Sequence, residues 1–213
     1  MPSRPQPETL FIDGPAGRLE ALLEAPAVVP SKGVALICHP HPQQGGTMQN
    51  KVAHTLARAF YRSGYTALRF NFRGVGKSAG EYDEARGELA DALACVDYLQ
   101  QRWPQAPFWL SGFSFGAAIA INAAIERRPH GLISIAPAVY RFANNLDKQP
   151  DCPWLIVHGD TDELVPIEET IQWVNDMEPG PELDIFEDTG HFFHGKLNEL
   201  RETVTNFVAN HDD

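Results

Sequence analysis

Short apolar runs alternate with segments of helical periodicity along most of the chain. Residues 33–39 (GVALICH) form a continuous apolar run, which is typical of a strand buried on both faces. Residues 51–64 then place apolar side chains at helical spacing and end at Gly64, a residue that often follows a helix. This alternation predicts right-handed βαβ units and a mostly parallel sheet with helices on both faces.

The same alternation continues to the end of the chain. It is preceded by residues 10–26, where two short apolar stretches around Gly14 and Gly17 favour a β-hairpin. The expected sheet therefore has about seven or eight strands. Further strands are expected at 65–72, 107–112, 131–137, 153–159 and 181–188, and further helices around Leu89 to Leu99 and at 115–128, 167–177 and 197–211.

The length of 213 residues fits one domain, because splitting it would leave two marginal cores. We expect a flexible N-terminus at 1–8, which is rich in proline, and a single α/β domain over 9–213. In a sheet of this kind, functional sites gather beyond the carboxyl ends of the strands. The loops that follow the strands are therefore the places to search for chemistry.

An excess of acidic residues gives the chain a net charge of −11. Nucleic acid and anionic membrane surfaces would repel such a chain, so we expect neither as its main partner. A small-molecule substrate fits this charge better, and the charge is compatible with both a monomer and a homodimer.

Three separated cysteines lack zinc-like spacing. No segment reaches the roughly 20 apolar residues of a membrane span. Since the N-terminus has no apolar signal segment, we expect a soluble cytoplasmic protein.

Residues 112–116 read GFSFG between a predicted strand and a predicted helix. A strand, a turn and a helix are the context of a nucleophile elbow, although such a pentapeptide also arises by chance. The turn would hold Ser114 in a strained conformation with its hydroxyl above the sheet, and the flanking glycines would leave room where strand and helix crowd. The alternative is an ordinary serine between two aromatic side chains.

A serine hydroxyl needs a base to remove its proton and a third group to orient that base. Two loops at the carboxyl ends of predicted strands offer both. Residues 158–166 contain Asp160, Asp162 and Glu163, and residues 187–195 contain His191 and His194. The order serine, acid, histidine is that of the α/β-hydrolase triad.

Several ordered motifs make the chain resemble an α/β-hydrolase, and more narrowly the small lidless bacterial hydrolases of the dienelactone-hydrolase-like and serine-aminopeptidase-like group. They are HPHPQQGGTMQNKV, LRFNFRGVGKSAG, SGFSFGA, VHGDTDELVP and TGHFFHGKL, and they are spread over most of the chain. In the family pattern H-G-x-x-D-x-x-V-P the acid follows the histidine by four places, which implies Asp162. In the pattern G-H-F the base follows the glycine, which implies His191. The resemblance therefore implies the α/β-hydrolase fold and a triad of Ser114, Asp162 and His191.

Each of these assignments has a rival in the same two loops. Asp160 suits an Asx turn that bonds its own backbone, so Asp162 is the better acid. Asp188 precedes His191 but faces the same loop, which makes it a poor partner across the site. His194 comes just before the last predicted helix, where it would help the first turn or line a pocket.

An acyl-transfer intermediate needs two backbone N–H donors aimed at its negative oxygen. One is expected from Phe115, the residue after the predicted nucleophile. The other is expected from the HPHP loop at 39–42, which follows a strand. Proline has no N–H, so His41 is the expected donor, with Gln43 or Gln44 as alternatives. In the family that the chain resembles, the donor usually comes from this place in the loop.

Two motifs invite other chemistry. The HPHP loop could place two imidazoles on one side of an extended chain as metal ligands. Since no third ligand at metal-like spacing accompanies it, we expect no metal and a buried His39 that is hydrogen-bonded to the loop. GVGKS at 74–78 is similar to the end of a phosphate-binding loop, but that motif also needs a glycine at position 71, where this chain has Asn71. We therefore expect Arg73 and Ser78 to bond neighbouring loops. No cofactor is expected.

The resemblance implies a serine hydrolase that transfers an acyl group to water, most simply a carboxylesterase on small or short-chain esters. A thioesterase, lactonase or small peptidase on the same triad is the alternative, and a catalytically silent scaffold used for binding is the alternative from another class. Relatives commonly insert a cap after the sixth core strand, but only 136–152 is available here, so we expect no cap domain and an open pocket. Four aromatic side chains are candidates to line the pocket, although each could equally be packing: Phe113, Tyr140, Phe142 and Phe192.

Overall fold

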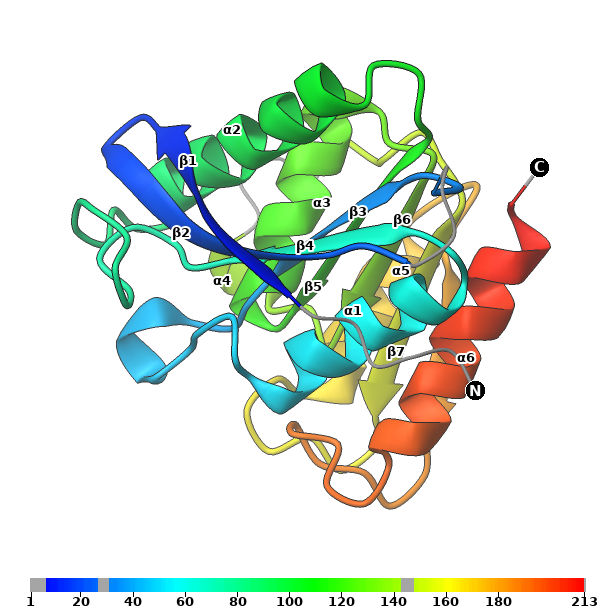
Figure 1. Cartoon of the computed structure of the whole chain (residues 1–213). Helices are drawn as coiled ribbons and strands as arrows, with labels where there is room; N and C mark the ends of the chain where they lie inside the picture. The colour runs from blue at the N-terminus through cyan, green and yellow to red at the C-terminus, as the bar shows by residue number, and fades with distance from the viewer. Residues whose placement is uncertain (1–6, 27–30, 143–147, 213) are drawn as a thin grey trace.

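The computed structural model describes residues 7–26, 31–142 and 148–212 (Figure 1). One sheet of eight strands runs through them in the order β1-β2-β4-β3-β5-β6-β7-β8. The six strands from β3 to β8 are parallel to one another, whereas β2 is antiparallel to both β1 and β4. The predicted α/β fold with a mostly parallel sheet is therefore confirmed. The strands are β1 Glu8–Gly14, β2 Gly17–Glu24, β3 Val34–Cys38, β4 Thr66–Phe70, β5 Phe108–Phe113, β6 Gly131–Ile135, β7 Trp154–Gly159 and β8 Glu182–Phe186.

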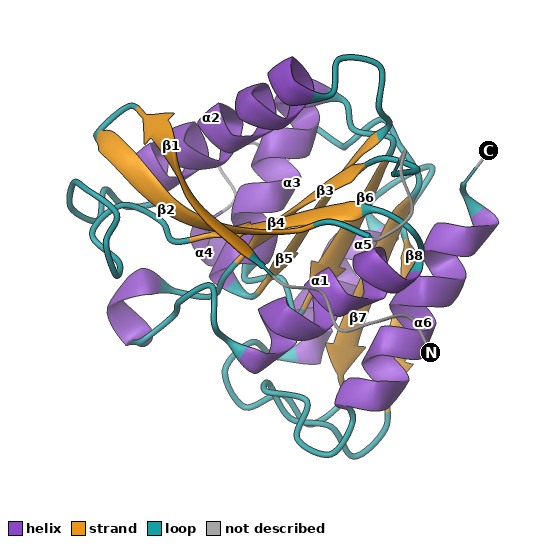
Figure 2. Cartoon of the chain, viewed as in Figure 1, coloured by secondary structure: helices purple, strands orange, loops and turns teal. Residues whose placement is uncertain are grey.

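Helices cover both faces of this sheet (Figure 1, Figure 2). One face packs against α2 and α3, and the other against α1 and α6. Neighbouring residues of one strand serve opposite faces: Leu36 joins the cluster with α2 and α3, and Ile37 joins the cluster with α1 and α6. Because both faces are buried, most strand positions must be apolar. The helices are α1 Lys51–Arg62, α2 Arg86–Arg102, α3 Phe115–Arg127, α4 Val139–Phe142, α5 Ile167–Asn175 and α6 Leu197–Asn210.

The N-terminal part of the chain forms the predicted hairpin. β1 and β2 pair from Glu8 opposite Leu23 to Gly14 opposite Gly17. Glu8 therefore already belongs to a strand, although the sequence pattern predicts flexibility up to this residue. Residues 1–6, on which most of that prediction falls, lie outside the described residues.

Two short helices have no counterpart in the sequence prediction. The 3₁₀ helix η1, Pro42–Gln44, and the helix α4 both follow the carboxyl end of a strand. Neither is long enough to show helical periodicity, so no pattern could reveal it. Within the described part of 136–152, α4 is the only helix, which leaves no room there for a cap domain. Among the described helices, none is long and apolar enough to cross a membrane.

Candidate active site

Ser114 lies at a sharp turn between β5 and α3. Its backbone has φ 56° and ψ −115°, a combination that a residue other than glycine adopts only under strain. Hydrogen bonds hold the turn: the Ser114 N–H donates to Ile135 O at 2.8 Å, and the Ser114 carbonyl accepts from the Ala117 N–H at 3.0 Å. These hydrogen bonds therefore keep a half-buried serine in a strained turn at the carboxyl end of a central strand.

The two glycines of this turn leave room for backbone atoms. A Cβ on Gly116 would lie 2.3 Å from the carbonyl oxygens of both Cys38 and His39. A Cβ on Gly112 would lie 2.2 Å from the carbonyl oxygen of Gly116. Side chains cannot make contacts this short, so the end of β3, the turn and the start of α3 can touch only with glycine at both positions.

The Asp162 carboxylate and the His191 imidazole are hydrogen-bonded. Asp162 Oδ2 lies 2.8 Å from His191 Nδ1, and both side chains are almost fully buried. The other carboxylate oxygen accepts the N–H groups of Leu164 at 2.9 Å and Val165 at 2.8 Å. Burial raises the pKa of this carboxyl, but hydrogen bonds from His158, His191 and Val165 outweigh burial and hold the pKa well below its usual range. The group is therefore ionised, and His191 Nδ1 carries the proton of the bond.

His158 is a second imidazole beside the same carboxylate, with no role predicted from sequence. Its Nε2 lies 2.9 Å from Val165 O and 3.3 Å from Asp162 Oδ2, and its side chain is fully buried. Since the Val165 carbonyl can only accept, His158 Nε2 carries a hydrogen and shares it with Asp162. The sequence did offer a signal for His158, because this residue is the first of the motif HGDTDELVP, which contains the acid Asp162.

The His191 ring lies against the turn that carries Ser114. Its centroid is 4.9 Å from that of Phe113, the residue before the serine, and 5.2 Å from that of Phe192. The His191 backbone N–H donates to Glu163 Oε2 at 3.2 Å, so Glu163 helps to position the histidine loop. With Nδ1 engaged, Nε2 is the nitrogen that remains for a reacting hydroxyl.

The rival residues have other surroundings. Asp160 Oδ1 accepts the N–H of Thr189 at 3.1 Å, so Asp160 joins the two loops instead of bonding its own backbone as predicted. Asp188 is exposed in a turn at φ 50°. His194 is also exposed. Of these carboxylates, it is Asp162 that bonds the imidazole.

The two predicted oxyanion donors belong to neighbouring residues. The ring centroids of His41 and Phe115 are 5.0 Å apart. Phe115 is the first residue of α3, so its N–H has no acceptor one turn earlier in the helix. The alternative donors are engaged: the Gln43 N–H donates to His41 Nδ1 at 3.2 Å, and the Gln44 N–H donates to His41 O at 3.1 Å. His41 stays the predicted donor of this loop.

His39 is a buried imidazole at the start of the same loop, as predicted. The Phe72 N–H donates to His39 Nε2 at 3.1 Å, and His39 Nδ1 lies 2.6 Å from Pro40 O. One nitrogen therefore accepts and the other donates, which is the pattern of a neutral ring. Burial lowers the pKa of His39 to about 4. With both nitrogens engaged, His39 has no free nitrogen to offer a metal ion.

A buried ion pair anchors the other end of this loop. Arg69 Nη1 donates to Met48 O at 2.7 Å, and Arg69 Nη2 lies 3.1 Å from Glu24 Oε2. The two charged side chains are only 3% and 4% exposed. Asn71 Oδ1 accepts the Met48 N–H at 2.9 Å, so Met48 is held through both its N–H and its carbonyl. No sequence motif predicts this anchor, and its only signal is an arginine inside an apolar strand.

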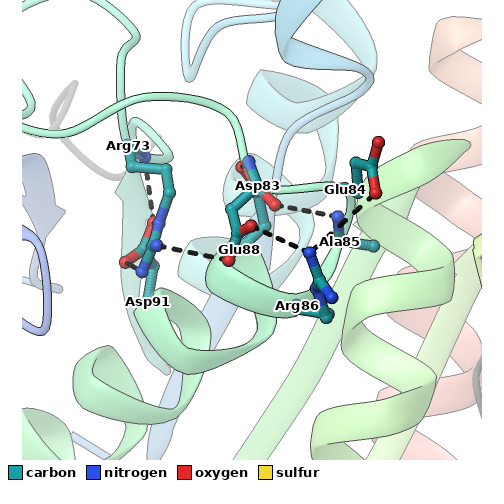
Figure 3. A network of polar contacts seen from close by, with 7 residues as sticks. All are labelled: Arg73, Asp83, Glu84, Ala85, Arg86, Glu88 and Asp91. Atoms are coloured by element: carbon teal, nitrogen blue, oxygen red, sulfur yellow. Dashed lines mark hydrogen bonds and ion pairs between the residues drawn. The ribbon is translucent and has the colours of Figure 1, made fainter.

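Arg73 and Ser78 hold the GVGKS loop in place, although their hydrogen-bond partners are not the neighbouring loops that the sequence predicts: Asp91 lies in α2, and Ser78 bonds its own loop and Glu20 of β2. Arg73 Nη2 donates to Asp91 Oδ1 at 2.8 Å, and Arg73 Nε donates to Asp91 Oδ2 at 3.0 Å (Figure 3). Glu88 of the same helix accepts the backbone N–H groups of Asp83 and Ala85, which precede α2. Ser78 Oγ donates to Asn71 O at 2.7 Å. The glycine-rich segment therefore has a structural role.

The four aromatic candidates for the pocket lining differ in exposure. Phe113 is fully buried in the cluster with α1 and α6, so it packs and does not face open space. Phe142 is half-buried, with its ring centroid 4.9 Å from that of Phe115. Tyr140 and Phe192 are 48% and 43% exposed. Of these two, Phe192 lies beside the site, with its ring centroid 5.2 Å from that of His191.

Comparison with known proteins finds relatives over most of the chain. Residues 30–148 match the family model described as serine aminopeptidase, S33. The protein RP471 of Rickettsia prowazekii is 35% identical over 210 residues, which cover 93% of this chain and 87% of that protein. The lysophosphatidylserine lipase ABHD12 of Xenopus tropicalis is 24% identical over 196 residues, and the match covers 69% of this chain but only 50% of the lipase.

Solved structures match the fold over nearly its whole length. An α/β serine hydrolase homologue from Coxiella burnetii has 44% sequence identity and a TM-score of 0.90, and the match covers 93% of this chain and 96% of that one. XC6422 from Xanthomonas campestris, an α/β serine hydrolase without a lid, has 38% identity and a TM-score of 0.91, with 99% and 97% covered.

Proposed function

The chain belongs to the serine aminopeptidase family of α/β serine hydrolases, and on that premise we propose that it hydrolyses small or short-chain carboxylic esters through an acyl-enzyme on Ser114. One observation carries the proposal. Asp162 and His191 share a 2.8 Å hydrogen bond, and the His191 ring packs on Phe113, directly before the strained serine. An oriented base beside a strained, half-buried hydroxyl is the arrangement that nucleophilic catalysis needs.

In the first step, His191 Nε2 takes the proton of Ser114 Oγ as the oxygen attacks the ester carbonyl. The negative oxygen that forms is stabilised by the N–H groups of Phe115 and His41. Asp162 keeps the proton on Nδ1 and stabilises the charged imidazole. The imidazolium then gives its proton to the alcohol oxygen, the ester bond breaks, and the acyl group stays on Ser114.

In the second step, water replaces the alcohol. His191 Nε2 takes a proton from the water, whose oxygen attacks the acyl carbon, and the serine oxygen leaves with that proton. The carboxylic acid is released and the free hydroxyl is restored. Each step uses side chains and backbone groups of this chain.

Esters are proposed for two reasons. The described part of the chain between β6 and β7 holds only the short helix α4, so the site is open to small substrates. The relative from Xenopus tropicalis is named for lipase activity, which is ester hydrolysis, although the chain spans only half of that protein.

A small peptidase is the second candidate, because the matched family model is named for an aminopeptidase. The same triad would then release an amine. Comparing p-nitrophenyl esters with amino-acid p-nitroanilides separates the candidates, and faster turnover of the anilides would replace the ester proposal. The candidate from another class is a silent scaffold that binds without chemistry.

Labelling with a fluorophosphonate, followed by peptide mapping, tests whether Ser114 is a reactive nucleophile. The expected result is one adduct on Ser114, and Ser114→Ala is expected to lose at least about 10⁴-fold in kcat on p-nitrophenyl acetate. Thermal unfolding of the variant checks that it is folded. If folded wild-type protein took no label at Ser114, the scaffold would be the better description.

A further inference from the structure

The two aromatic residues that flank Ser114 lie on opposite sides of the sheet. Phe113 belongs to the cluster with α1 and α6, and its ring centroid is 6.2 Å from that of Phe192. Phe115 belongs to the cluster with α2 and α3, and its ring centroid is 5.0 Å from that of His41. We call the part of the candidate site next to α1 and α6 the Phe113 side, and the part next to α2 and α3 the Phe115 side.

Packed rings occupy the Phe115 side. The His41 ring lies 5.1 Å from Tyr82 and 5.3 Å from Phe142, measured between centroids, in addition to its contact with Phe115. Tyr82 Oη lies 3.3 Å from His41 Nε2, which ties two of the rings together. A substrate group on this side meets side chains that already pack against one another, so only a small group fits without moving them.

A cleft of about 440 Å³ opens on the Phe113 side, between the start of α1 and the loop before α6. Val52, Phe192 and Leu197 contribute apolar surface to it, and Lys51 and His194 are among its polar lining. The Phe192 ring is 43% exposed and lies 5.2 Å from the His191 ring. Clefts of this volume are large enough to hold a ring-sized group.

The proposed chemistry assigns the two sides of the site to the two halves of an ester. His191 Nε2 must hand its proton to the oxygen of the departing alcohol, so the alcohol half lies next to His191. Phe192, which follows His191 in the chain, lines the cleft. The negative oxygen must meet the N–H groups of Phe115 and His41, which sets the carbonyl toward the Phe115 side.

We propose that the cleft binds the alcohol half of the substrate, so that the protein selects esters of a small acid with an apolar, ring-sized alcohol. This inference rests on the proposed function. If the cleft binds the alcohol, the size of the alcohol group, and not of the acyl group, is the main determinant of kcat/KM. Phe192 is the residue that determines this specificity through contact with the alcohol.

Two isomeric esters test the assignment directly. Benzyl acetate carries its ring on the alcohol half, and methyl phenylacetate carries the same ring on the acyl half. After division by the alkaline hydrolysis rate of each ester, kcat/KM is expected to be at least about tenfold higher for benzyl acetate. Equal values, or a preference for methyl phenylacetate, would overturn the inference.

Variants separate this role from a general structural effect. Phe192→Ala is expected to lower kcat/KM for benzyl acetate about tenfold more than for methyl acetate, since only the former has a ring to bind. Both esters form the same acetyl-enzyme, so the rate of its hydrolysis should not distinguish them. Phe11→Ala is the matched control, because Phe11 is 41% exposed on β1, and its kcat/KM ratio should equal that of wild type.

The outcomes distinguish this inference from the proposed function. If Phe192→Ala lowered kcat/KM for both acetates by the same factor, the alcohol assignment would be wrong while the hydrolase proposal stood. If no ester were hydrolysed and Ser114 took no fluorophosphonate, both would be wrong. Phe142→Ala is a further test, because it removes one of the rings that occupy the Phe115 side. The variant should raise kcat/KM for methyl phenylacetate relative to benzyl acetate.

Discussion

Asp162 Oδ2 lies 2.8 Å from His191 Nδ1, while Asp162 Oδ1 accepts two backbone N–H groups from its own loop. Both oxygens of the carboxylate are therefore engaged. His158 Nε2 adds a fourth contact, 3.3 Å from Asp162 Oδ2. A carboxylate fixed in this way can hold His191 in one tautomer and one orientation, and this is the basis of the first prediction.

Asp162→Asn is expected to lower kcat by about 10⁴-fold, because an amide cannot favour the proton on His191 Nδ1 as a carboxylate does. The measurement is turnover of p-nitrophenyl acetate near neutral pH. Asp160→Asn is the matched control, since its amide oxygen can still accept the Thr189 N–H, and it should retain most of the activity. The reverse pattern would move the catalytic acid to Asp160.

Gly116→Ala should force apart the end of β3 and the turn at Ser114, since its Cβ would lie 2.3 Å from two carbonyl oxygens. The expected cost is about 1–3 kcal/mol in the free energy of unfolding, together with a lower kcat. Urea unfolding and ester turnover measure the two effects. In Gly180→Ala the new Cβ has no neighbour nearer than 3.4 Å, so its stability should stay within about 0.5 kcal/mol of wild type. Equal stability of the two variants would contradict the close approach.

His39 should make folding sensitive to mild acid. Its pKa is about 4 in the folded protein, against about 6.5 in an unfolded chain. Between these values the unfolded chain binds more protons, so stability is complete above about pH 6.5 and falls as the pH decreases toward 4. The loss attributable to His39 is up to roughly 3 kcal/mol.

Urea unfolding of His39→Gln at stepped pH measures this contribution. The variant should be less stable than wild type at neutral pH, because the Phe72 and Pro40 hydrogen bonds change, but its slope between about pH 6.5 and 4 should be shallower. His194→Gln, at an exposed position, should keep the wild-type slope. A slope for His39→Gln as steep as that of wild type would show that another group carries the effect.

Glu24→Ala should destabilise the fold by about 3–5 kcal/mol, because it leaves the Arg69 guanidinium buried without its carboxylate. Arg127→Ala breaks a pair with Asp97 in which the side chains are 32% and 48% exposed, so it should cost only about 1 kcal/mol or less. Both values come from urea unfolding. Similar values for the two variants would mean that Arg69 does not depend on Glu24.

The prediction of the elements worked because both faces of the parallel strands are buried. Leu36 and Ile37 serve opposite clusters, so the strand must be apolar throughout and stands out in the sequence. α4 could not be predicted, since its four residues carry no period. The anchor between Glu24 and Arg69 could not be predicted either, because the partners are 45 positions apart and no local pattern joins them.

For the site, the sequence by itself determined which loops would meet. Asp162 and His191 follow the neighbouring parallel strands β7 and β8, and such strands end at the same edge of a sheet. The resemblance favoured Asp162, but only the tertiary structure showed which carboxylate reaches the imidazole, since Asp160 and Asp162 differ by two positions and a hydrogen bond depends on fractions of an ångström. It alone also put Phe113 and Phe115 on opposite sides of the serine, because side-chain direction is set by packing against the two layers of helices.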